Sequence, residues 1–235
     1  MITLDNVLQK YDDYKRGIID KWIDDRLEKN NNEGLKFIFW HTFPRGRRDE
    51  LSDRYYNGTI DLLKLETDEH AVSKLLEYDE DTIRDKLKEK LTNAKDIDMV
   101  ISMVQFMRNT DTNPYKYFKT IITKEENGIY KAYYKLDGIK QIGDKLATFV
   151  IRDIVLINQK LKTNFDADEY RLMFPVDTWV RQKGKELLNE QNIDDYHLKS
   201  RLIELCKTKS LTNSDPLAPL KLNVGLWWMG KHQSD

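Results

Sequence analysis

The stretch KLDGIKQIGDKLATFVIRDIVLI, residues 135–157, holds the pattern that best predicts the fold of this chain. A short helix is expected to end near Leu136, and Gly138 and Gly143 bracket a tight turn. A second helix begins near Gly143, and its apolar residues cover much of its circumference, which predicts a buried helix. Its N-terminus should therefore reach the surface, where free backbone amides can bind an anion such as a DNA phosphate.

Helical patterns recur along the rest of the chain. Residues 4–29 carry apolar side chains at helical spacing, and NNNEG at 30–34 is expected to end that helix. The segment DIDMVISMVQFMRN, residues 96–109, is apolar on most sides and predicts a core helix. Strict apolar–polar alternation is nearly absent, and 10 Gly and 5 Pro argue against a loop-rich β protein. We predict an all-α fold, and 235 residues suit one large domain or two intimately packed lobes.

Composition narrows the classes of function. The formal net charge of −1 does not indicate a nucleic-acid partner, so a local patch or backbone amides would have to hold one. Cys206 is the single cysteine, which excludes a disulfide framework, a four-cysteine zinc site and a cysteine-held iron–sulfur cluster within this chain. The four histidines lack ligand spacing, so no metal site is expected. Without a signal peptide or a membrane-spanning run, we expect a reducing, intracellular compartment.

Lys145 lies in the first turn of the second helix. The helix macrodipole disfavours a cation there by about 0.3–1 kcal/mol. With partial burial, the same field favours the neutral amine, which is the nucleophilic form. The alternative interpretation is a solvated lysine on a polar surface.

Asp177 lies within FPVDTWVRQ, residues 174–182. Pro175 and Val176 indicate extended chain and Thr178 begins a helix, so Asp177 occupies the N-cap position. Hydrogen bonds from backbone amides would fix its carboxylate in place. The alternative is a purely structural cap.

Taken in order, IGDKLA at 142–147 and PVDTWV at 175–180 resemble two motifs of the helix-hairpin-helix DNA glycosylase superfamily. The hairpin motif of that family has the form L-P-G-[VI]-G-x-K-x-A, and the second motif contains V-D. Gln141 stands where the first hairpin glycine is usual, and Trp179 stands where many relatives have histidine. The long insertion NQKLKTNFDADEYRLM and the lack of cluster-binding cysteines look like the archaeal 8-oxoguanine DNA glycosylase branch.

This resemblance implies one domain over residues 1–235, built as two helical lobes with a cleft between them and a helix-hairpin-helix at 135–158. The N-terminal and C-terminal segments would pair in one lobe, and the middle helices would form the other. Lys145 would supply the amine that attacks C1′ of the damaged nucleotide, leading to a Schiff base and strand cleavage. Asp177 would face it across the cleft and stabilise the positive charge that develops on the sugar.

A base must leave the duplex to be reached, so the pocket needs flat apolar faces and a few polar groups. Phe149 would stack on the base, and Arg152, on the same helix face, would lie at the pocket edge or bind phosphate. The resemblance adds Trp227 as a stacking wall and Asn223 as a polar reader. Contacts to the DNA backbone are assigned to three hairpin residues: Gln141, Ile142 and Gly143.

Further candidates are weaker. Trp40, His41 and Gln105 are other candidate pocket residues, although core or surface roles are favoured for each, and Trp228 is favoured as core. The cluster RGRR at 45–48 would either contact DNA phosphate or form a solvated turn.

We therefore expect a DNA repair glycosylase and abasic-site lyase that excises an oxidised purine, with 8-oxoguanine as the first substrate to test. The alternatives are a glycosylase for another damaged base and a non-catalytic protein that uses the hairpin only to bind DNA. The expected partner is double-stranded DNA containing a damaged base, bound by a monomer in the cytoplasm without membrane association. No cofactor is expected, and a structural monovalent cation at the hairpin would bind only together with DNA.

Overall fold

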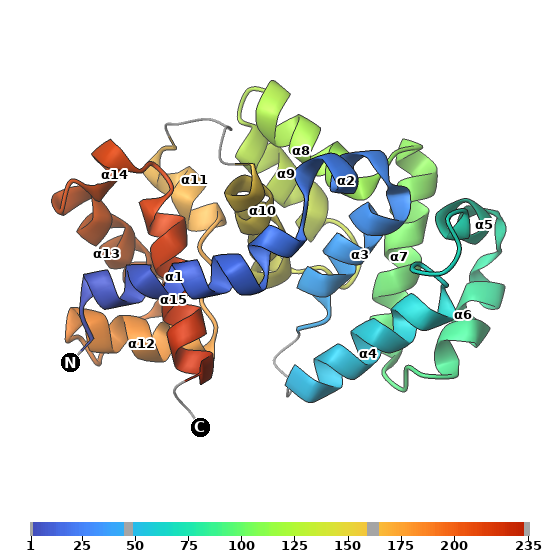
Figure 1. Ribbon diagram of the computed structural model, residues 1–235, viewed down its shortest axis with the longest axis horizontal. Coiled ribbons are helices and arrows are strands. Elements are labelled where there is room, and N and C mark those ends of the chain that lie inside the picture. The colour runs from blue at the N-terminus through green and yellow to red at the C-terminus, as the bar shows by residue number, and fades with distance from the viewer. Residues whose placement is uncertain (1, 45–48, 159–164, 233–235) are drawn as a thin grey trace. The chain divides into compact units, whose positions relative to one another are not determined.

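The computed structural model describes residues 2–44, 49–158 and 165–232 (Figure 1). Within these ranges the chain forms helices joined by turns and contains no β-strand. The prediction of an all-α protein is confirmed. No helix within these ranges is long and apolar enough to cross a membrane.

The chain divides into two compact units. Unit 1 contains Met1–Trp22 and Ile151–Asp235, and unit 2 contains Ile23–Val150, so the first and last segments share one unit, as predicted. The helices of unit 1 are α1 (Leu4–Gly17), η1 (Ile19–Lys21), α11 (Ala167–Leu172), α12 (Thr178–Leu188), α13 (Asp195–Thr208), α14 (Leu211–Ser214) and α15 (Ala218–His232). Those of unit 2 are α2 (Asp24–Lys29), α3 (Asn31–Thr42), α4 (Asp49–Leu62), α5 (Ala71–Glu77), α6 (Glu80–Lys88), α7 (Ala94–Thr110), α8 (Pro114–Lys124) and α9 (Gly128–Asp137). The boundary falls inside α10 (Asp144–Ile157), which contributes residues to both units.

The prediction of one continuous helix over residues 4–29 is wrong, because the chain leaves the helical conformation after Gly17. Ile18 has φ −126° and ψ −62°, and the short helix η1 follows before α2 begins. A glycine followed by the β-branched residues Ile18 and Ile19 has low helix propensity, which explains why the break occurs here.

Side-chain caps set the starts of two helices in unit 2. Asn30 accepts a hydrogen bond from the amide of Glu33 at 3.2 Å, so the NNNEG segment starts α3 directly after α2 ends. Pro114 occupies the first turn of α8, as its position in the sequence predicts, and Asn113 accepts from the amide of Lys116 at 3.1 Å. Both helix starts thus follow from local side-chain chemistry.

Unit 1 is built around α15, which packs against α1 and α12 (Figure 1). A Cβ atom at Gly225 would lie 2.0 Å from the carbonyl oxygen of Val7 in α1. A Cβ atom at Gly230 would lie 2.7 Å from the Cβ atom of Trp179 in α12. Because no other residue fits at these distances, the two glycines of LNVGLWWMG allow α15 to approach both neighbours closely.

The core of unit 2 contains fully buried residues of α3 and α7. Phe37 and Phe39 of α3 and Met99 and Met103 of α7 have no exposed surface. The prediction that residues 96–109 form a core helix is confirmed. Burial of these large apolar side chains supplies the main driving force for folding of this unit.

Candidate functional site

The connection between α9 and α10 is short and closely hydrogen-bonded. The amide of Ile142 donates to the carbonyl of Ile139 at 2.9 Å, which closes a turn over the two residues between them. The carbonyl of Gly143 then accepts from the amides of Leu146 and Ala147 at 2.9 and 3.0 Å and begins α10. The helix bounds agree with those expected from the sequence to within about a residue.

Gln141, the third residue of this turn, has φ +72°. This is the left-handed region, which glycine occupies without strain and which costs other residues on the order of 1 kcal/mol. In the glycosylase hairpin motif that this segment resembles, the first glycine stands at the position of Gln141. The backbone at this position therefore has a conformation that glycine favours, although the side chain differs.

Substitution at Gln141 should reveal this backbone conformation. We expect Gln141→Gly to change the free energy of unfolding by less than about 0.5 kcal/mol, because relief of strain offsets the greater freedom of the unfolded chain. Gln141→Val should destabilise by about 1–2 kcal/mol, because a β-branched residue is strained at positive φ. Urea denaturation of the two variants measures both values, and equal stability of the two would contradict the assigned conformation.

The backbone amides at the start of α10 are not used in hydrogen bonds within the helix. Among the described residues, the amides of Gly143, Asp144 and Lys145 have no hydrogen-bond acceptor. Such amides, together with the positive end of the helix macrodipole, favour an anion. The carboxylate of Asp144 accepts a hydrogen bond from the hydroxyl of Tyr133 at 2.7 Å, which ties the end of α9 to the start of α10.

Lys145 is half-buried and has no carboxylate oxygen within 4.0 Å among the described residues. Its Nζ lies 5.7 Å from the centre of the Phe149 ring, one helical turn further along. An aromatic face is a weak partner for a cation compared with a carboxylate. The amine of Lys145 is therefore not held in an ion pair within the described chain.

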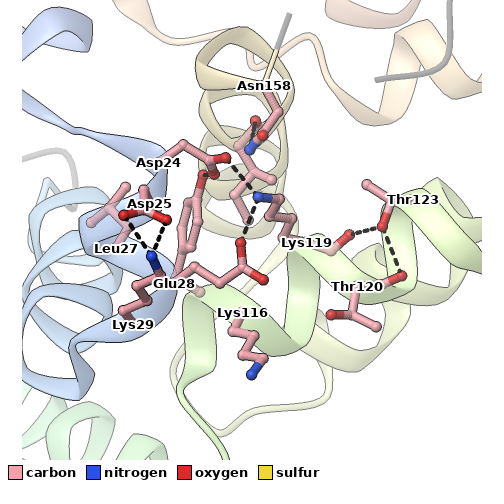
Figure 2. A network of polar contacts seen from close by, with 12 residues as sticks. Asp24, Asp25, Leu27, Glu28, Lys29, Lys116, Lys119, Thr120, Thr123 and Asn158 are labelled. Carbon is pink, nitrogen blue, oxygen red and sulfur yellow. Dashed lines mark hydrogen bonds and ion pairs between the residues drawn. The ribbon is translucent and has the colours of Figure 1, made fainter. Parts of the chain in front are cut away.

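Lys119 shows the contrasting case. Figure 2 shows Lys119 of α8 between Asp24 and Glu28 of α2, with Nζ–oxygen distances of 2.6 and 2.8 Å. Burial lowers the pKa of Lys119, but its hydrogen bonds to the two carboxylates outweigh burial, so the pKa is raised. This lysine stays protonated at neutral pH and ties α2 to α8, which makes it unsuited to act as a nucleophile.

Asp177 caps α12, as the sequence predicts. Its Oδ1 accepts a hydrogen bond from the amide of Val180 at 2.9 Å, and its own backbone is extended at φ −103° and ψ −171°. Lys145 belongs to unit 2 and Asp177 to unit 1, and each is described within its own unit. The pairing of Lys145 with Asp177 across a cleft stays a prediction.

Two substitutions of Asp177 separate its role as the N-cap of α12 from a role of its charge. We expect Asp177→Ala to lower the free energy of unfolding by about 1 kcal/mol, because the amide of Val180 loses its acceptor. Asp177→Asn should keep stability within a few tenths of a kcal/mol, roughly as expected for an equally good N-cap residue. Chemical denaturation gives both values, and a large loss in the Asn variant would show that the charge itself stabilises the fold.

Two of the predicted base-contacting residues lie in a buried network within unit 1. Arg152 is 2% exposed and Asn223 is fully buried, and the Arg152 guanidinium donates to Asn223 Oδ1 at 2.9 Å. Arg152 also donates to Asp153 at 2.7 Å, and Asp153 accepts from the hydroxyl of Tyr14 at 2.5 Å. The hydrogen bonds of Arg152 and Asn223 thus go to the chain itself, and contact of either residue with a base stays a prediction.

Trp227 and Trp228 are both half-buried. Each ring packs edge-on against Tyr14, with centroid distances of 5.8 and 5.7 Å. Trp228 also lies against Gly17 and the ring of His232. It is half-buried, so the expectation that Trp228 is a core residue is wrong. The ammonium of Lys231 lies 4.9 Å from the centre of the Trp227 ring, so a face of this ring holds a cation, and stacking of Trp227 on a base stays a prediction.

The weaker candidates have structural roles. His41 is buried, with Nδ1 2.7 Å from the carbonyl oxygen of Phe37, and Gln105 donates to Glu80 at the surface. Trp40 packs edge-on against Tyr56. The RGRR cluster at 45–48 lies outside the described residues. Core and surface interpretations of His41 and Gln105 therefore agree with the structure.

Sequence reasoning missed Asp153 and Tyr14 as members of the buried network. A signal was present, because Arg152 and Asp153 are adjacent charges inside the apolar run FVIRDIVLI, and charges in such a run are usually paired. Tyr14 lies 139 residues away in sequence from Asp153, so no local pattern indicates it.

Comparison with known proteins adds no relative. No family model matches the chain, and no match was found among curated proteins or solved structures. Within the described residues, no group of three or more His, Cys, Asp or Glu side chains is arranged to hold a metal ion. The two motifs and the geometry of the residues within them are therefore what indicates a function for this chain.

Proposed function

We propose that the protein is a DNA glycosylase with abasic-site lyase activity that excises an oxidised purine, with 8-oxoguanine as the preferred candidate. The observation that carries the proposal is the amine of Lys145, which has no carboxylate partner among the described residues. It stands in the first turn of α10, directly after a turn whose Gln141 has glycine-like φ. Its position matches the lysine of the hairpin motif.

The proposed reaction uses two side chains. The neutral amine of Lys145 attacks C1′, the bond from C1′ to the base breaks, and the base leaves with the bonding electrons and takes up a proton. The new bond from nitrogen to C1′ becomes a Schiff base as the sugar ring opens. Loss of a C2′ proton then expels the 3′ phosphate by β-elimination. The carboxylate of Asp177 stabilises the positive charge that builds on the sugar before the base has left.

The free amides at the start of α10 supply the second part of the proposal. A DNA phosphate bound to the amides of Gly143 and Asp144 would be fixed to the same helical turn as the Lys145 amine. Phosphate binding there would place the sugar of a flipped nucleotide near the nucleophile. This arrangement would allow a chain with net charge −1 to bind DNA, because backbone amides attract phosphate without any formal charge.

Borohydride trapping tests the proposal. The protein is mixed with a duplex that contains one 8-oxoguanine, one abasic site or no lesion, and the mixture is reduced. We expect a covalent protein–DNA adduct with the first two duplexes and none with the third. An adduct with the abasic duplex alone keeps the lyase and moves the search to other damaged bases. No adduct with either, together with salt-dependent binding to all three, identifies a non-catalytic DNA-binding protein.

A further inference from the structure

Pro175 and Val176 precede Asp177 in a segment with no secondary structure of its own, between α11 and α12. The position of the Asp177 carboxylate therefore depends on how firmly the backbone of this segment is held. Asn223 of α15 holds that backbone, because its side-chain amide donates to the carbonyl oxygen of Pro175 at 2.8 Å. This contact joins the segment to the central helix of unit 1.

The orientation of Asn223 is itself fixed. Its Oδ1 accepts from Arg152 at 2.9 Å while its Nδ2 donates to Pro175, so both ends of the amide are used inside the protein. Arg152 is in turn held by Asp153 at 2.7 Å. An aspartate at position 223 would accept from Arg152 but would not donate to Pro175, and a leucine would do neither. The chemistry of this position therefore fits asparagine.

We propose that Asn223 is a positioning residue that fixes the backbone before Asp177 and so places the Asp177 carboxylate for the reaction. The inference rests on the proposed function, and it replaces the expectation that Asn223 reads the damaged base. Asn223 is fully buried, and each polar atom of its side chain already bonds to the chain. Its effect is on the rate of the chemical step, with no direct contact to DNA.

An amide-exchange measurement tests the positioning role without any need for activity. The amide of Val180 donates to Asp177 Oδ1 at 2.9 Å, so its hydrogen exchange reports on the placement of that carboxylate. The amide of His197 is a matched control, because it donates to Asp194 Oδ1 at 2.9 Å in the same cap geometry on α13. We expect Asn223→Leu and Asn223→Asp to speed exchange at Val180 about ten-fold or more while His197 changes less than about two-fold.

The same variants separate rate from binding. We expect the single-turnover lyase rate to fall about ten-fold or more, while the Kd for an abasic duplex changes less than about three-fold. Unchanged exchange at Val180 in both variants overturns the positioning role, as does equal acceleration at Val180 and His197. A weaker Kd with normal exchange would return Asn223 to the base-contacting residues. If the wild-type protein shows no lyase activity, the proposed function fails, and the exchange comparison still decides whether Asn223 positions Asp177.

Discussion

Replacing Lys145 with glutamine is expected to abolish the borohydride-trapped adduct, because glutamine has no amine to form the Schiff base. Binding of the damaged duplex should change by less than about three-fold, since the free amides of the α10 N-terminus remain. Gel quantification of the adduct and fluorescence anisotropy with labelled duplex measure the two quantities. Loss of the adduct with retained binding would separate the chemical step from DNA recognition.

The matched control is Lys135→Gln. Lys135 is exposed and lies on α9, on the other side of the turn from Lys145. Its removal deletes one lysine from the same region without touching the first turn of α10, so the adduct should form at the wild-type rate. A normal adduct in the Lys145→Gln protein, or loss of the adduct in both variants, would contradict the assignment of Lys145.

The features that were predicted correctly from the sequence are helix starts, which depend on residues close together in the chain. The Asp177 cap depends on one side chain and an amide three residues away, and the start of α10 depends on a short turn next to an apolar run. The break after Gly17 was missed because the apolar spacing continues through it, and that spacing was given more weight than the low helix propensity of Gly17 and the residues after it.

The environment of the site residues was harder to predict. Helical spacing correctly places Arg152 on the face of α10 that carries Lys145 and Phe149. Helical spacing alone does not show whether the Arg152 side chain contacts a ligand or packs against other helices. Two partners of Arg152, Tyr14 of α1 and Asn223 of α15, come from the two ends of the chain, and only tertiary packing brings them to it.

Arg152→Met is expected to lower the free energy of unfolding of unit 1 by about 3–5 kcal/mol, because it removes the guanidinium that donates to the buried carboxylate of Asp153. Burial opposes the charge on Arg152, but the attractions of Asp153 and Tyr14 and the hydrogen bond to Asp153 outweigh burial, so the pKa of the guanidinium is raised and Arg152 carries its charge inside the fold. Methionine has a similar length, so the change removes the charge and leaves most of the packing. Urea denaturation measures the loss.

Tryptophan fluorescence suits this measurement. Trp22, Trp179, Trp227 and Trp228 belong to unit 1, and Trp40 belongs to unit 2. The signal therefore reports mainly on the unit that contains the buried network. Arg84→Met is a control of the same chemistry in unit 2, where Arg84 makes partly exposed ion pairs with Glu80 and Asp98. We expect it to cost no more than about 1 kcal/mol.

The double variant Arg152→Met/Asp153→Leu decides what the network contributes. If the cost of the single change comes from an uncompensated buried charge, removal of both charges should recover at least about 2 kcal/mol relative to the sum of the two single changes. Additive losses would mean that each side chain stabilises the unit by its own packing. In that case the attraction between Arg152 and Asp153 would not be what holds the Arg152 guanidinium in place. The orientation of Asn223, which accepts from that guanidinium, would then depend on the packing of the core around it.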